Sequence, residues 1–182
     1  IKLLIVKREE TPTQPLIDFI LSSGEFNSRI CSNALPTDLG SFQIILIIDS
    51  DLLSVSDEQR IAEFLDDGGG CVTLLKRGDS NTSFSGISIN ESMPRCPMRV
   101  KWTERGRKFA DRMPEEVSIT DTLMPLVNLD KSADVVLEAN WRLQTYPVAV
   151  MERKGQGVHF CISLAAFDDE FVQRLIFRFI MT

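Results

Sequence analysis

The chain has 182 residues, of which 43% are hydrophobic and 25% are charged, and its formal net charge is −6. This length and composition are typical of one folded domain with its own hydrophobic core. The acidic balance argues against a nucleic-acid partner, because binding to a phosphate backbone depends on clustered positive charge. We interpret the basic residues between 95 and 108 as a solvated face. No membrane partner is expected, since a spanning helix needs about 20 apolar residues and the apolar runs here are far shorter.

The first half of the chain predicts alternating strands and helices. The expected elements are a strand at residues 2–7, a helix at 14–22, a weaker strand at 25–32, a strand at 44–48, a helix at 56–67 and a strand at 71–75. Ser56, with Gln59 three residues later, fits a capping box for the second helix. The glycines at 68–70 close that helix, whereas a phosphate-binding loop would open one. Two buried strands joined by one helix predict a parallel sheet.

The second half predicts a long loop, further strands and a closing helix. The expected elements are a loop at residues 78–97, a strand at 98–103, a short helix or turn within 106–116, an extended or irregular segment at 117–129, strands at 135–139, 148–152 and 157–164, and a helix at 168–180 capped by Asp168 or Asp169. The turn at 154–157 predicts that the last two strands form a hairpin.

Together these elements predict an α/β fold. It is a three-layer α/β/α sandwich with a mostly parallel, flavodoxin-like sheet and a C-terminal β-hairpin. We expect a single domain over residues 1–182. Because the chain opens inside a predicted strand, we also expect this domain to have been excised from a longer protein.

Two segments of this framework resemble a known family. Residues 53–75 read LSVSDEQRIAEFLDDGGGCVTLL, and residues 147–164 read PVAVMERKGQGVHFCISL. In order and spacing they resemble the corresponding segments of the trehalose-utilisation (ThuA-like) proteins, which belong to the class I glutamine amidotransferase-like superfamily. Residues 171–180 are similar to the closing helix of that family. The resemblance implies the flavodoxin-like fold of the superfamily.

The resemblance also implies where catalytic residues would stand. Amidotransferases place a catalytic cysteine on the turn after the strand that residues 71–75 resemble, and ThuA-like proteins often place a histidine near it. Leu75 and Lys76 stand at that turn here, while Cys71 lies inside the strand. Ala165 and Ala166 follow the last strand, where many ThuA-like proteins carry a Gly-His pair. The catalytic residues of the family are therefore not carried over, and the prediction leans against an enzyme.

Polar side chains follow two neighbouring strands of the predicted sheet. The predicted ligand-binding residues are Asp49, Ser50, Asp51, Lys76, Arg77 and Asp79. Parallel sheets place their sites just beyond the carboxyl ends of their strands, so we expect these side chains to lie close together. One interpretation is a mutual ion pair that caps an unused crevice. The other is a polar pocket for an anionic or carbohydrate ligand.

The cysteines and the single histidine predict neither a metal site nor a cofactor. The four cysteines lack CxxC spacing, and His159 cannot complete a usual zinc site with them. His159 and Cys161 stand two positions apart on one strand, which separates their Cβ atoms by roughly 6–7 Å. We therefore interpret His159 as a packing residue and not as half of a Cys–His dyad. Buried, reduced thiols slightly favour the cytoplasm, although the sequence leaves the compartment open.

Three functional hypotheses follow. The first is a non-catalytic module that binds a ligand or another protein, in a carbohydrate-related context. The second is a sugar-modifying hydrolase or isomerase that uses the polar residues at the strand ends. The third is an assembly domain of a larger complex. The expected partners are a small polar or carbohydrate ligand and other domains of a longer parent chain.

Overall fold

The computed structural model describes residues 1–76, 84–89 and 92–182. Its strands are β1 (Lys2–Val6), β2 (Asn27–Cys31), β3 (Ile44–Ile47), β4 (Gly70–Leu74), β5 (Ser88–Ile89), β6 (Arg95–Trp102), β7 (Glu116–Thr122), β8 (Leu126–Val127), β9 (Asp134–Trp141), β10 (Gln144–Lys154) and β11 (Gly157–Ile162). Its helices are α1 (Gln14–Ser22), α2 (Val55–Asp66) and α3 (Glu170–Ile180), with short 3-10 helices η1 (Ser50–Leu52) and η2 (Arg107–Phe109). Within these residues, no helix is long and apolar enough to span a membrane.

One large sheet organises the molecule, with strand order β2-β1-β3-β4-β11-β10-β9-β6-β7. The first five strands in this order are parallel to one another. The apolar runs of β1, β3, β4 and β11 are buried almost throughout because helices cover both faces, whereas the edge strand β2 is largely exposed. This part of the sheet is the mostly parallel, flavodoxin-like core that the sequence predicted, and that prediction is confirmed.

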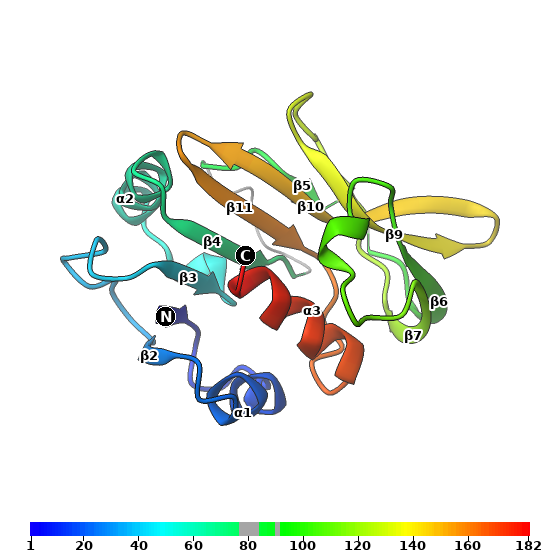
Figure 1. Cartoon of the computed structure of the whole chain (residues 1–182), viewed down its shortest axis with the longest axis horizontal. Helices are drawn as coiled ribbons and strands as arrows, with labels where there is room; N and C mark the ends of the chain where they lie inside the picture. Colours follow the sequence, from blue (N-terminus) through cyan, green and yellow to red (C-terminus); the bar gives the residue numbers. More distant parts are fainter. Residues whose placement is uncertain (77–83, 90–91) are drawn as a thin grey trace.

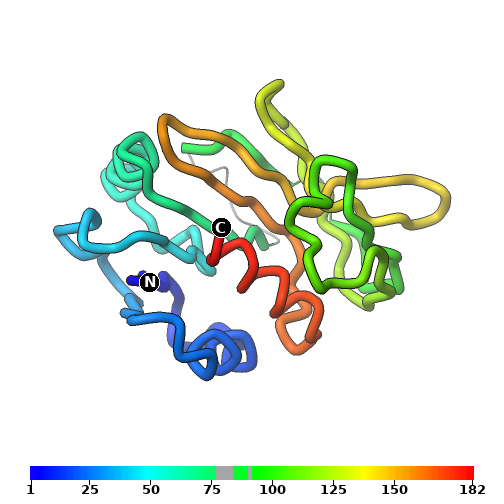
Figure 2. Tube along the Cα trace, viewed as in Figure 1, coloured from blue at the N-terminus to red at the C-terminus, as the bar shows by residue number. Residues whose placement is uncertain are grey.

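The remaining strands extend the sheet in antiparallel fashion. β10 and β11 form the predicted hairpin, and β9, β6 and β7 continue from β10. In Figure 2 the blue and cyan part of the trace belongs to the parallel half, which the green β4 and the orange β11 complete, and the yellow part belongs to this extension. The sequence had indicated only shorter strands at 98–103 and 135–139, so the antiparallel extension is larger than expected.

The helices lie in two layers, one on each side of the sheet. α1 and α3 pack on one face, where their apolar residues join those of the sheet in the main core (Figure 1). α2 packs on the opposite face through Ile61, Phe64 and Leu65. The three-layer sandwich is therefore confirmed. The closing helix begins where expected, because the Asp169 side chain accepts hydrogen bonds from the first backbone N–H groups of α3.

The start of α2 differs from the prediction. Ser54, and not Ser56, is the N-terminal cap, and it forms a capping box with Asp57 instead of Gln59. The Ser54 hydroxyl accepts from the Asp57 backbone N–H at 3.2 Å, and an Asp57 carboxylate oxygen accepts from the Ser54 N–H at the same distance. Here the Asp57 carboxylate closes the box, two residues before the predicted Gln59. The glycines after α2 allow a close approach, since a Cβ on Gly69 would lie 2.3 Å from the Phe64 ring.

The predicted loop at 78–97 is only partly a loop. Residues 77–83 and 90–91 lie outside the described residues. β5 pairs with β8 in a separate two-stranded sheet, and β6 begins at Arg95, earlier than expected. Ile87 is fully buried and joins a small apolar cluster with Leu126. The described part of this segment therefore covers the sheet.

Candidate functional site

The carboxyl ends of β3 and β4 bring Asp49 and Lys76 together, as predicted. The Lys76 ammonium donates to Asp49 Oδ1 at 2.6 Å. Asp49 Oδ2 accepts from the Arg8 backbone N–H at 2.7 Å and from the Thr11 hydroxyl at 2.8 Å. The buried carboxylate thus has partners on both oxygens. Arg8 and Thr11 follow β1, the next strand in the sheet, and the sequence analysis missed them.

These contacts fix the ionisation of Asp49. Burial alone would raise the pKa of this carboxyl, but the hydrogen bonds from Lys76, Arg8 and Thr11, together with the Lys76 charge, outweigh it and lower the pKa. Asp49 is therefore a carboxylate at neutral pH and is held in an ion pair. A group in this state is poorly suited to take up a proton as a general base, because protonation would cost it the ion pair.

The other predicted ligand-binding residues lie around this pair. Asp51 forms an exposed ion pair with the Arg8 guanidinium. Ser50 is buried at the start of η1. Arg77 and Asp79 lie outside the described residues, so the structure does not place them. A ligand role for the six residues stays a prediction.

The turn after β4 presents no nucleophile at Leu75 or Lys76. Leu75 is only 3% exposed and packs in an apolar cluster with Ile87 and Val150. Its backbone N–H donates to the Ile162 carbonyl at 2.8 Å, which continues the β4–β11 pairing past the strand end. Leu75 is therefore part of the core at the position where the resemblance would place a catalytic side chain.

A buried carboxylate accepts hydrogen bonds from the backbone of the segment after β11. The backbone N–H groups of Ala165 and Ala166 donate to Asp121 Oδ2 at 2.7 and 3.0 Å. Asp121 lies on β7 and is 6% exposed. Backbone amides at this position are consequently satisfied within the chain, and Asp121 ties the antiparallel extension to the start of α3.

His159 lies in a buried polar cluster on the face of the sheet that α2 covers. Its Nε2 is 3.0 Å from the Thr73 hydroxyl and 3.5 Å from Cys161 Sγ. Its Nδ1 is 3.5 Å from a Glu152 carboxylate oxygen, and the Phe84 ring packs edge-on against the imidazole. His159 is fully buried and Glu152 almost so. The cluster thus combines a thiol, an imidazole and a carboxylate.

One geometric argument from the sequence was wrong. The Cβ spacing had placed Cys161 out of reach of His159, but the two side chains lean toward each other along the strand, and Sγ reaches Nε2. The conclusion that His159 packs in the interior still agrees with its burial. The sequence analysis did not identify Glu152, although the turn at 154–157 sets the register that pairs Glu152 with His159. Counting back from that turn would have found it.

Ionisation in this cluster is set by its neighbours. Burial alone would lower the pKa of His159, but Cys161 and Glu152 outweigh it and raise the pKa to about 9. A pKa of about 9 favours the protonated imidazole at neutral pH, with Cys161 Sγ and a Glu152 carboxylate oxygen each 3.5 Å from a ring nitrogen. Nearby, burial raises the pKa of Cys71 to about 12, so this thiol is unreactive. Among the described residues, no group of three or more His, Cys, Asp or Glu side chains could hold a metal ion.

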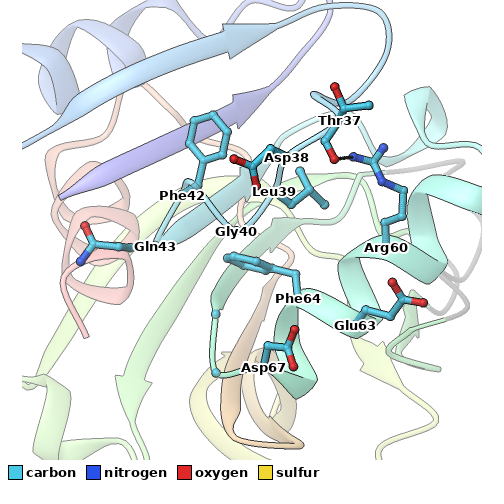
Figure 3. A pocket seen from close by; sticks show the side chains of 12 residues that line it. Thr37, Asp38, Leu39, Gly40, Phe42, Gln43, Arg60, Glu63, Phe64 and Asp67 are labelled. Atoms are coloured by element: carbon cyan, nitrogen blue, oxygen red, sulfur yellow. Dashed lines mark hydrogen bonds between the residues drawn. The ribbon is translucent and has the colours of Figure 1, made fainter.

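The largest of five cavities on the described residues lies at the opposite end of the strands from Asp49. It has a volume of about 630 Å³ and opens between α2 and the segment that precedes β3 (Figure 3). Leu39, Phe42 and Phe64 form its apolar part. Arg60 borders it and donates to the carbonyls of Pro36 and Thr37, which ties this segment to α2. None of the five main cavities on the described part of the chain is lined by Asp49, Asp51 or Lys76.

The architecture and strand order define a flavodoxin-like α/β fold, and this fold is similar to those of known glutamine amidotransferases. A glutamine amidotransferase from Thermotoga maritima superposes with a TM-score of 0.68 over 100% of this chain and 96% of its own, at 11% identity. A ThuA-like protein from Bacteroides uniformis superposes with a TM-score of 0.70 over 98% of this chain and 89% of its own, at 12% identity.

A third solved structure contains the fold within a longer chain. The β-galactosidase from Bacillus circulans sp. alkalophilus superposes with a TM-score of 0.67 at 13% identity, and the match covers 97% of this chain but only 30% of that enzyme. No family model and no curated protein sequence matches this chain. At these identities the likeness shows the fold alone.

Proposed function

We propose that the chain is a non-catalytic member of the class I glutamine amidotransferase-like superfamily, nearest to the ThuA-like proteins, that serves as a ligand-binding or interaction module. The observation that carries the proposal is the turn after β4. In place of a nucleophile, this turn offers a buried leucine and then Lys76, which is paired with Asp49.

The buried cluster around His159 supports the same proposal. A thiol beside a protonated imidazole has the chemistry of an activated nucleophile. Cys161 and His159 are 1% and 0% exposed, and Phe84 packs edge-on against the imidazole. A substrate would have to displace this packing to reach the sulfur, so the cluster acts in the folded protein as a structural element.

The ion pairs at the carboxyl ends of the strands argue against the sugar-modifying alternative. That hypothesis uses Asp49, Asp51, Lys76 or Arg77 at an open polar pocket. Asp49 and Asp51 are instead engaged by Lys76 and Arg8, and Arg77 lies outside the described residues. A carbohydrate-related context is supported by the β-galactosidase, in which the similar part makes up less than a third of the enzyme. By analogy, we propose that this chain works beside other domains of a longer protein, with a small polar or carbohydrate ligand as a further partner.

Turnover assays test the proposal. The purified chain is incubated with glutamine, with p-nitrophenyl glycosides and with p-nitrophenyl esters, and ammonia or nitrophenol release is measured. We expect rates equal to those of buffer. The proposal is overturned if turnover is clear in the wild type and is abolished by Lys76→Ala or Asp51→Ala in folded protein. Lys101→Ala is the matched control, because Lys101 forms only a long, exposed ion pair with Glu138 at 3.9 Å.

A further inference from the structure

A basic, partly apolar cavity lies between α1, α3 and the segment that follows η2. Its volume is about 350 Å³. We call it the α1–α3 cavity, and its lining residues are Phe19, Arg112, Met113, Arg174, Phe177, Arg178 and Met181. Three of these side chains carry a positive charge and none carries a negative one. The chain as a whole has a net charge of −6, so this cavity is a local positive cluster on an acidic protein.

The apolar part of the cavity is aromatic. Phe19 on α1 and Phe177 on α3 pack edge to face, with ring centroids 5.9 Å apart. Phe26 also packs edge to face against the Phe177 ring, with centroids 5.5 Å apart. Met113 and Met181 complete the wall with flexible, polarisable side chains that adapt to a bound ring. These side chains offer a surface for a flat apolar group.

The arginines keep most of their charge available. Arg178 donates to the Asp111 backbone carbonyl at 2.7 Å, and a carbonyl leaves the guanidinium charge uncompensated. Arg174 pairs with Glu170 at 2.6 Å, but both side chains are more than half exposed. Arg112 is 90% exposed, and its Nε lies 3.9 Å from the Asp111 carboxylate. Exposed pairs of this kind are weak and give way readily to a better anion.

The combination defines the ligand chemistry. Guanidinium groups bind carboxylates in a two-pronged geometry that a neutral sugar cannot match. An aromatic wall beside them selects for an apolar body attached to the charge. A cavity near the lower end of the range for small-molecule sites admits one or two fused rings. We propose that the α1–α3 cavity binds a small aromatic carboxylate, a site independent of the proposed function.

Isothermal titration calorimetry with 2-naphthoate tests this site. Two comparison ligands separate its features, since 2-naphthylmethanol keeps the rings without the charge and acetate keeps the charge without the rings. We expect naphthoate to bind at least about tenfold more tightly than either, which corresponds to about 1.4 kcal/mol. Inorganic phosphate is a third comparison ligand. If phosphate binds and naphthoate does not, the aromatic part of the proposal is overturned.

Variants locate the binding. Arg178→Gln should raise the dissociation constant for naphthoate about tenfold, as expected for loss of one charge-assisted hydrogen bond. Arg112→Gln should weaken binding in the same direction and carries little risk to folding because the side chain is exposed. Arg99→Gln, which alters an exposed arginine on β6, is the matched control and should bind like the wild type. The proposal is refuted if naphthoate does not bind, if it binds no better than the alcohol, or if both cavity variants bind as well as the control. Catalytic turnover would overturn the proposed function and leave this site intact.

Discussion

The buried His159 cluster should make the protein less stable at alkaline pH. The neighbours of the imidazole are Glu152 on β10, Thr73 and Cys71 on β4, Cys161 on its own strand, and the Phe84 ring. Of these, Cys161 and then Glu152 raise the pKa of His159, and Lys154 lies 3.6 Å from the Glu152 carboxylate. Because the folded protein holds a proton on His159 up to a pKa of about 9, folding and protonation are linked.

The sign and size of the effect follow from this linkage. The unfolded chain binds the same proton with an ordinary pKa of 6.5. The raised pKa therefore contributes stability that is fully present below about pH 6.5 and is lost as pH rises toward about 9. Since each pKa unit corresponds to about 1.4 kcal/mol, the loss is on the order of 3 kcal/mol across this window.

Urea unfolding at pH 6, 7.5 and 9.5 measures this effect. The wild type should lose on the order of 3 kcal/mol more unfolding free energy between the lowest and highest pH than His159→Gln does. Comparing the pH dependence of the unfolding free energy between the wild type and the variant removes the contribution of other groups that titrate above pH 8. Glu152→Gln is the second variant and should also flatten the profile. Parallel pH profiles for the wild type and both variants would refute the reasoning.

Three further predictions concern stability and are measured by urea unfolding. Ser54→Ala should cost about 1 kcal/mol through loss of the α2 cap, while Ser56→Ala should be nearly neutral; equal costs would contradict the observed cap. Asp49→Asn should cost about 2 kcal/mol at pH 7, because the ion pair is lost. The lowered pKa of Asp49 adds stability above the ordinary carboxyl range that is lost on acidification, so this cost should shrink at low pH; a pH-independent cost would refute that account. Gly69→Ala should cost about 1–3 kcal/mol, since its Cβ would overlap the Phe64 ring, and a neutral result would show that the ring moves freely.

The parallel half of the fold could be predicted from local patterns. Apolar runs of strand length joined by helices with one apolar face leave few arrangements other than a parallel sheet between two helical layers. The antiparallel extension could be predicted less well, because strands such as β6 carry alternating polar residues and a proline, and their pairing partners are distant in sequence. Pattern alone does not fix such long-range pairing.

The candidate site shows the same division. That Asp49 and Lys76 are neighbours could be predicted because both follow adjacent parallel strands. The contributions of Arg8 and Thr11 depend on how the segment after β1 turns back over Asp49, and no local signal reports it. The cap of α2 was misplaced because two serines compete over one turn, and backbone conformation decides between them.

The proposal of a non-catalytic module is tested most directly by whether Cys161 can react in the folded protein. Native protein is treated with iodoacetamide near neutral pH, and labelling of each cysteine is followed by mass spectrometry against a urea-unfolded control. We expect Cys161 and Cys71 to remain unlabelled on the time scale in which the half-buried Cys31 is modified. Rapid labelling of Cys161 in the native protein, lost in His159→Gln, would show an accessible and activated thiol and would contradict the account.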